Sequence, residues 1–332
     1  MYFCSSNFIS DKKILFKGKN MMDINKKMNR RDALKCMGAA VLSGAVATSG
    51  LLSLAACSTN NKKRVILYFT GTGNCLYIAR QLAGKDGEIL SIPQLVKNKQ
   101  YEIEADEIGI VYPIYGHMPP HMVWEYIKKA KLHASYKFAV LTYGKRKCSA
   151  VEIWNDISRK ANNAFDYIGT IVMVDNWLPN FDMNEQMKMD KHIPENLAKI
   201  SKDINAHRRW HEPVSQEERE QHQEFLQRSG IDPKKGFLLK CEDYFVVSGS
   251  CIECGICTYV CPHGNYKLTA DGAQMKGDCE FCFACIQNCP QKAIQFAEQE
   301  GAFPPLPEKN PNARYRNEHV SLMDLKEANS QF

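Results

Sequence analysis

Eight cysteines near the C-terminus occur in two copies of one spacing. The copies read Cys251-x-x-Cys254-x-x-Cys257-x-x-x-Cys261-Pro262 and Cys279-x-x-Cys282-x-x-Cys285-x-x-x-Cys289-Pro290. Thiolate is a soft ligand that suits iron–sulfur clusters and zinc. Structural zinc sites usually take Cys-x-x-Cys pairs that lie well apart, whereas here three cysteines follow one another closely. The repeated spacing therefore favours iron–sulfur clusters over zinc or a disulfide framework.

The same segment resembles a two-cluster bacterial ferredoxin from Lys240 to about Phe296. In that family three cysteines of one run and the last cysteine of the other run hold each cluster. The resemblance implies that the ligands of cluster one are Cys251, Cys254, Cys257 and Cys289. It implies that the ligands of cluster two are Cys279, Cys282, Cys285 and Cys261. His263 is expected to be a loop residue, because the sulfur ligands are complete without it.

A second candidate site is the stretch Thr70-Gly71-Thr72-Gly73-Asn74-Cys75, which follows an apolar run and precedes a helical pattern. Strand, glycine-rich turn and helix together favour phosphate, because free N–H groups and the helix dipole attract anions. The third glycine of a dinucleotide fingerprint is replaced by Leu76, and the Walker lysine pattern is absent. The stretch resembles the FMN phosphate loop of flavodoxins, with Cys75 where Ser or Thr is usual. The alternative is a tight turn in an ordinary α/β domain.

Five apolar runs alternate with helical patterns and would position this loop. The runs cover residues 65–69, 88–92, 108–112, 138–142 and 168–174. Alternation of this kind predicts a flavodoxin-like, doubly wound parallel sheet with the strand order 2-1-3-4-5. The loops after strands one, three and four then meet where FMN binds. Two of these loops carry Tyr115-Gly116 and Tyr143-Gly144, so we expect the flavin ring between Tyr115 and Tyr143.

The segments around the two domains have weaker patterns. A helix is predicted over 194–206, and Ser215-x-x-Glu218 is a capping box that opens a polar helix ending near Gly230. We expect this polar helix to be a solvated connector. A short helix is predicted from about Ser321, after the proline-rich stretch 303–307. The predicted organisation is 1–63 signal and tether, 64–210 flavodoxin-like domain, 211–239 helical connector, 240–298 ferredoxin domain of α+β class and 299–332 C-terminal extension.

The N-terminus has the features of an export signal. Arg30-Arg31 resembles a twin-arginine motif, and the uncharged run 36–56 ends at Cys57 in a sequence that resembles a lipobox. We therefore expect an exported protein that is anchored to the extracytoplasmic face of the membrane through lipidated Cys57. The alternative is an uncleaved membrane helix. Residues 1–57 carry nine Lys/Arg and three Asp, which account for the whole net charge of +6, so no nucleic-acid partner is expected.

Over about residues 64–332 the chain resembles the bacterial fusion family of a flavodoxin-like domain with a two-cluster ferredoxin. The resemblance implies electron transfer with FMN and two [4Fe-4S] clusters as cofactors. The partner would be a redox protein or a small-molecule electron donor or acceptor. One alternative is a flavin-dependent reductase of a quinone or other small oxidant. Another is a cluster-binding protein with an empty flavodoxin-like domain. No acid–base or nucleophile constellation stands out, so catalysis stays open.

Overall fold

The computed structural model describes residues 63–232, 238–297 and 308–332. The twin-arginine segment, the lipobox with Cys57 and the proline-rich stretch 303–307 lie outside the described residues. Among the described residues, no helix has the length and apolar character that crossing a membrane requires.

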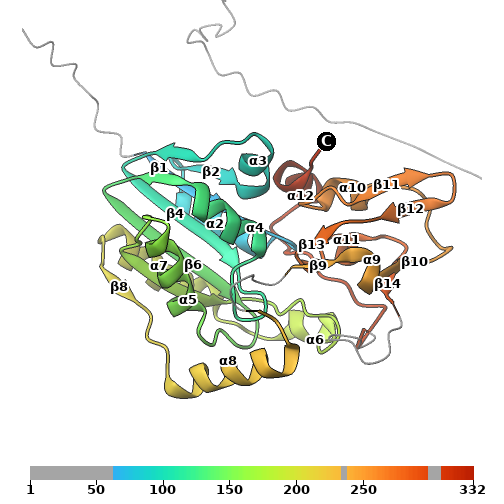
Figure 1. The fold of residues 1–332 in the computed structure, drawn as a ribbon. Helices are drawn as coiled ribbons and strands as arrows, with labels where there is room; N and C mark the ends of the chain where they lie inside the picture. The colour runs from blue at the N-terminus through green and yellow to red at the C-terminus, as the bar shows by residue number, and fades with distance from the viewer. Residues whose placement is uncertain (1–62, 233–237, 298–307) are drawn as a thin grey trace, which may run out of the picture. The chain divides into compact units, whose positions relative to one another are not determined.

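A parallel sheet of flavodoxin-like topology forms the first half of the described chain (Figure 1). Its strands are β1 (Arg64–Tyr68), β2 (Glu88–Ser91), β4 (Glu107–Pro113), β6 (Tyr136–Tyr143), β7 (Tyr167–Val172) and β8 (Trp210–His211). The order is β2-β1-β4-β6-β7-β8, and each neighbouring pair is parallel. The predicted fold class and the order of the first five strands are therefore confirmed. The short edge strand β8 was not predicted.

Apolar runs explain why these segments form the centre of the sheet. Val65, Ile66 and Leu67 of β1 are almost fully buried, as expected of a strand covered on both faces. The helices of this part are α2 (Asn74–Ala83), α3 (Ile92–Lys97), α4 (His121–Lys129), α5 (Ala150–Lys160), α6 (Met183–Lys188) and α7 (Ile193–Asn205). A separate parallel pair consists of β3 (Glu102–Glu104) and β5 (Lys131–His133). The polar helix α8 (Gln216–Ser229) begins at the predicted capping box of Ser215 and Glu218 and ends at Gly230.

The cysteine-rich part is built from short elements. They are β9 (Leu239–Lys240), α9 (Cys241–Tyr244), β10 (Phe245–Val247), α10 (Ile256–Val260), β11 (Tyr266–Thr269), β12 (Gly272–Met275), β13 (Asp278–Cys279), α11 (Ala284–Asn288) and β14 (Ile294–Phe296). The pair β10–β14 is antiparallel and so is the pair β11–β12. Helices α10 and α11 pack together, and each contains the third cysteine of its run, Cys257 or Cys285. This arrangement is an α+β fold of ferredoxin type.

The C-terminal helix α12 (Leu322–Asn329) lies between α3 and α10 (Figure 1). It begins at Ser321, as predicted. Its Asp324 pairs with Arg80 of α2 at 2.5 Å, and the Asn329 side chain donates to the carbonyl oxygen of Thr70 at 3.0 Å. The extension thus connects the ferredoxin part with the loop after β1.

Candidate cofactor sites

Two small cavities in the ferredoxin part are lined by cysteines. Cysteine cavity one is lined by Cys251, Cys254, Cys257 and Cys289. Cysteine cavity two is lined by Cys261, Cys279, Cys282 and Cys285, and also by Cys241, which lies outside the two runs. Apart from Cys241, each cavity takes three cysteines from one run and the last cysteine from the other, and these two sets of four are the sets that the ferredoxin resemblance implies. The fold thus brings all eight predicted ligands to two places.

The surroundings of the two cavities suit iron–sulfur clusters. The four thiols of each set surround a space. Apolar side chains such as Val247, Ile256 and Ile294 cover cavity one. Backbone N–H groups donate to sulfur, including Ala293 to Cys289 at 3.2 Å and Phe281 to Cys279 at 3.4 Å. Such cover and such hydrogen bonds tune cluster potentials.

Burial and neighbouring thiols raise the pKa of Cys257 and of Cys285 to about 12, so these two thiols would stay protonated without a metal. Metal ligands must be thiolates, so loading these positions releases protons. The cationic core of an iron–sulfur cluster would supply the charge that stabilises the thiolates there.

The two cysteine cavities differ in exposure. In cavity one Cys254 is exposed, and the adjacent Ile252 is 59% exposed. In cavity two Cys282 is only 7% exposed. A Cβ placed on Gly71 would lie 2.4 Å from the carbonyl oxygen of Cys282, so the loop after β1 touches this ligand. Cavity two therefore faces the sheet domain, whereas cavity one reaches the surface.

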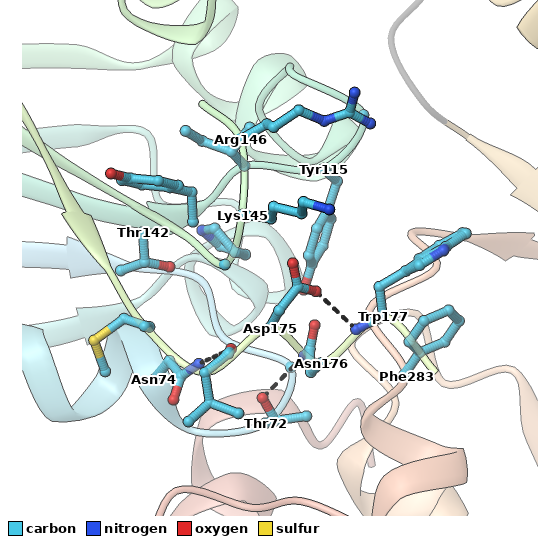
Figure 2. A pocket seen from close by; sticks show the side chains of 18 of the residues that line it. Thr72, Asn74, Tyr115, Thr142, Lys145, Arg146, Asp175, Asn176, Trp177 and Phe283 are labelled. Carbon is cyan, nitrogen blue, oxygen red and sulfur yellow. Dashed lines mark hydrogen bonds between the residues drawn. The ribbon is translucent and has the colours of Figure 1, made fainter. Parts of the chain in front are cut away.

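A larger cavity of about 510 Å³, here called the main cavity, lies at the carboxyl ends of the sheet strands (Figure 2). Nine of the ten residues predicted to bind FMN line it: Thr70, Gly71, Thr72, Asn74, Cys75, Tyr115, Gly116, Tyr143 and Gly144. The tenth, Gly73, is not a lining residue. Its φ is +100°, and a Cβ there would meet Val320 at 2.9 Å and Asn317 at 3.1 Å. Glycine is thus required at this position by the chain's own C-terminal extension.

The phosphate loop presents free donors at the N-terminus of α2. No side chain caps this helix, and its first N–H groups have no partner within the helix. The N–H of Gly73 donates to Oγ1 of Thr70 at 3.1 Å, and the side chain of Asn176 donates to Oγ1 of Thr72 at 3.0 Å. Each hydroxyl therefore keeps its own proton for a ligand. This arrangement fits a phosphate group.

Two side chains of the predicted loop already interact with other residues of the protein. Asn74 donates to the carbonyl oxygen of Val174 at 3.2 Å, and its Oδ1 accepts from the Tyr315 hydroxyl at 2.5 Å. Cys75 lies 3.2 Å from Oγ1 of Thr142, and burial raises the pKa of its thiol to about 12. These two residues can therefore offer a ligand their backbone N–H groups, while their side chains hold the loop in place.

Both predicted tyrosines reach the main cavity but differ in orientation. Tyr115 packs edge-on against Phe69 with ring centroids 6.4 Å apart, and its hydroxyl oxygen lies near Gly71. The hydroxyl group of Tyr143 is hydrogen-bonded with Thr170. Burial raises the pKa of both phenols, so both stay neutral at physiological pH. The stacking of a flavin between them stays a prediction.

Sequence reasoning missed the aromatic wall of the main cavity. Trp177 follows β7, and its ring lies 5.3 Å from Phe283 and 6.1 Å from Phe281 (centroid to centroid). Both phenylalanines belong to the Cys279–Cys285 run, so the wall joins the sheet domain to cysteine cavity two. In the sequence, the only sign that these two phenylalanines belong to a site was their position beside the predicted cluster cysteines. The wall itself depends on contacts between residues about a hundred positions apart.

Helix α8 also differs from its expected role as a solvated connector. Most of its residues are exposed, but His222 is buried, and Phe225 and Arg228 line the main cavity. These three residues recur every three positions and share one face of the helix. The inner face of α8 is thus part of the site.

Comparison with known proteins supports the iron–sulfur part directly. Residues 244–299 match the family of 4Fe-4S dicluster domains. No curated protein matches the chain. This segment is therefore an iron–sulfur domain.

Two similar solved structures each cover 33% of this chain. One is a flavoprotein in complex with FMN from Lactobacillus acidophilus NCFM, with 16% identity, a TM-score of 0.25, and coverage of 33% of this chain and 93% of that chain. Another is from Bacteroides uniformis ATCC 8492 and is described provisionally as a flavoprotein. It has 14% identity and a TM-score of 0.25, and the match covers 33% of this chain and 90% of that chain. At this level of similarity neither structure carries an argument about a ligand of this chain.

Proposed function

We propose that the chain is an electron-transfer protein in which FMN bound in the main cavity exchanges electrons with two [4Fe-4S] clusters. One observation carries this proposal: the main cavity and cysteine cavity two share a wall. Phe281 and Phe283 line the main cavity, and Cys282 between them lines cavity two. Two cofactors held on opposite sides of one short loop would be close enough for direct electron exchange.

The residues present fit both cofactors. The eight cysteines would hold the clusters in the two sets described above. Backbone N–H groups of residues 71–75 and the hydroxyls of Thr70 and Thr72 would hold the FMN phosphate. When bound, the flavin would couple two-electron donors or acceptors to clusters that pass one electron at a time.

Cofactor analysis tests the proposal. Protein purified anaerobically should contain about eight irons and matching sulfide per chain. It should bind FMN tightly, and reduction of the clusters by dithionite should be followed by reduction of the flavin within the same chain. Zinc in place of iron, or no affinity for FMN, would refute the proposal. Intact clusters without FMN affinity would support the alternative of an empty flavodoxin-like domain.

The proposed place of action is the extracytoplasmic face of the membrane. Two sequence features support it, the twin arginines Arg30-Arg31 and the lipobox that ends at Cys57. Export of a folded protein would suit this chain, because its clusters are coupled to folding. Cys57→Ala should leave the signal unprocessed or the protein unanchored, and Arg30→Lys with Arg31→Lys should block export. Wild-type protein found free in the cytoplasm would contradict this part of the proposal.

A further inference from the structure

Three cationic side chains surround the main cavity and are here called the cationic rim. Lys145 and Arg146 come from the loop after β6, and Arg228 comes from the end of α8. All three are exposed. The rim thus combines two segments that are far apart in the sequence.

The charge of the rim is not neutralised locally. The neighbouring Lys147 forms ion pairs with Glu212 and Glu218, but no ion pair of a rim residue is present in the described part of the chain. Among the described residues that line the cavity, Asp175 is the only acid, so three cations face one carboxylate there, a formal net charge of +2. Burial and nearby cations lower the pKa of the lining residue His117 to about 3, so it adds no charge at neutral pH. The mouth of the cavity is therefore positive.

The rim lies away from the phosphate loop. In Figure 2, Thr72 and Asn74 lie at one end of the cavity, and Lys145 and Arg146 lie at the other, with Asp175 between them. The phosphate loop has its own helix N-terminus and hydroxyl groups. A phosphate bound there does not need the rim.

Flat aromatic surfaces accompany the rim. Trp177, Phe181 and Phe225 line the same cavity, and the Lys145 ammonium group lies 5.9 Å from the centroid of the Phe181 ring. Aromatic walls with a few cations suit a ligand that is planar and negatively charged, because stacking and Coulomb attraction then act together.

We propose that the cationic rim and these aromatic residues form a subsite for a planar organic anion, an aromatic or quinone-type carboxylate, which binds beside the flavin. The proposal rests on the proposed function, because it makes this anion the second ligand of the flavin site. It also gives the reductase alternative a class of substrate.

Binding to the FMN-loaded full chain tests the subsite, with 2-naphthoate as the probe and neutral 2-naphthamide as its analogue. We expect 2-naphthoate to bind about tenfold more tightly at low ionic strength and to lose this advantage as salt is added. The variant Lys145→Gln/Arg146→Gln/Arg228→Gln should bind both compounds equally. The matched variant Lys128→Gln/Arg159→Gln/Lys160→Gln removes three exposed cations elsewhere and should keep the preference.

Two outcomes would overturn the subsite. One is equal binding of 2-naphthoate and 2-naphthamide by the wild type. The other is a rim variant that loses the preference for FMN over riboflavin, which would show that the rim holds the flavin phosphate. Binding of 2-naphthoate by protein that has no affinity for FMN would refute the proposed function and still support the subsite.

Discussion

At the scale of single residues, Gly71 brings the phosphate loop and cysteine cavity two together. An alanine there would place Cβ 2.4 Å from the carbonyl oxygen of Cys282 and 3.1 Å from its Cβ. Backbone must then move, so Gly71→Ala should destabilise the protein by about 1–3 kcal/mol. It should also slow electron exchange between flavin and clusters at unchanged iron content. Stopped-flow absorbance and denaturant unfolding measure the two effects.

Gly249 supplies the control for this substitution, because no atom lies within 4 Å of the position where its Cβ would be. Gly249→Ala should leave both the electron-exchange rate and stability close to wild type. If Gly71→Ala behaves in the same way, the close contact with Cys282 is not part of the electron path.

The buried position of His117 predicts that the stability of the protein falls as the pH is lowered. Its side chain is 6% exposed, and its Nδ1 lies 3.4 Å from Nδ1 of His222. Burial, His222, Arg146 and Arg228 lower its pKa from 6.5 to about 3. Below pH 6.5 the unfolded chain therefore binds a proton that the folded chain does not bind. Stability should fall as pH falls from about 6.5 towards 3, by up to about 1.4 kcal/mol per pH unit for this group.

The variant His117→Asn should remove the contribution of His117 to the dependence of stability on pH. Asn tolerates the positive φ of 65° at this position, so the backbone can be kept. Denaturant unfolding at pH 7, 6 and 5 under anaerobic conditions measures the slope. His133→Asn, which replaces an exposed histidine, is the matched control. An unchanged slope in His117→Asn would contradict the assignment.

At the scale of elements, helix α4 takes its cap from the ferredoxin part. Its N-cap residue is Pro120, whose side chain cannot accept a hydrogen bond. Glu280 accepts from the N–H groups of His121 at 2.6 Å and Met122 at 2.8 Å, and from Nε2 of His263 at 2.9 Å. A buried carboxylate at a helix N-terminus satisfies two orphan donors and matches the helix dipole.

Glu280→Gln should therefore destabilise the protein by about 2 kcal/mol, because charge-assisted bonds are lost and an amide –NH₂ meets backbone donors. Denaturant unfolding of the cluster-loaded protein measures the change. Glu125→Gln, on the same helix, removes an exposed pair with Lys128 and should cost less than about 1 kcal/mol. Equal effects of the two substitutions would mean that Glu280 is no cap.

The predictability of the elements follows from how local their signals are. Strands β1, β4, β6 and β7 contain continuous apolar runs, and buried parallel strands require such runs. The two-residue strand β8 is too short for any pattern. Helix α8 has a strong local start signal in its capping box, but only Phe225, Leu226 and His222 suggest an inner face. Its contribution to the main cavity depends on tertiary packing, which its polar composition does not predict.

The candidate sites also differ in how local their sequence signals are. The cysteine sets could be predicted from spacing and family resemblance, because ligand type and order are local to two short runs. The phosphate loop could be predicted too, but the roles of its members could not. Asn74 and Gly73 serve contacts with Tyr315, Asn317 and Val320, which come from the other end of the chain.

At the scale of the whole molecule, the C-terminal extension links the phosphate loop to the ferredoxin part. The Tyr315 hydroxyl donates to Asn74, and its N–H donates to Oε1 of Gln287 in α11 at 2.7 Å. Tyr315 is 6% exposed. Tyr315→Ala should cost about 3 kcal/mol of stability and weaken FMN affinity several-fold, although Tyr315 does not line the main cavity.

Fluorescence titration with FMN and denaturant unfolding test this role of the C-terminal extension. Phe332→Ala changes an aromatic residue of the same extension that is 71% exposed, so it should leave FMN affinity unchanged. FMN affinity of wild-type strength in Tyr315→Ala, with stability reduced, would mean that the extension supports the fold but not the phosphate loop.

The arrangement of the three cavities predicts an order of electron transfer. The main cavity shares Phe281 and Phe283 with the loop of cysteine cavity two, and Gly71 touches Cys282. Within the described part of the chain, cavity one has no lining residue in common with the main cavity, and its Cys254 is exposed. We therefore expect the flavin to exchange electrons with cluster two, and an external redox partner to exchange electrons with cluster one.

Single ligand changes separate the two clusters. Cys254→Ser should impair cluster one and electron exchange with an external partner, while flavin still exchanges electrons with cluster two. Cys282→Ser should instead abolish exchange with flavin and leave cluster one reducible from outside. Electron paramagnetic resonance of partly reduced protein identifies the cluster that remains, and rapid mixing with a small ferredoxin measures the external exchange. If Cys254→Ser loses the flavin exchange while cluster two is intact, the order is reversed, because the flavin would then depend on the surface cluster.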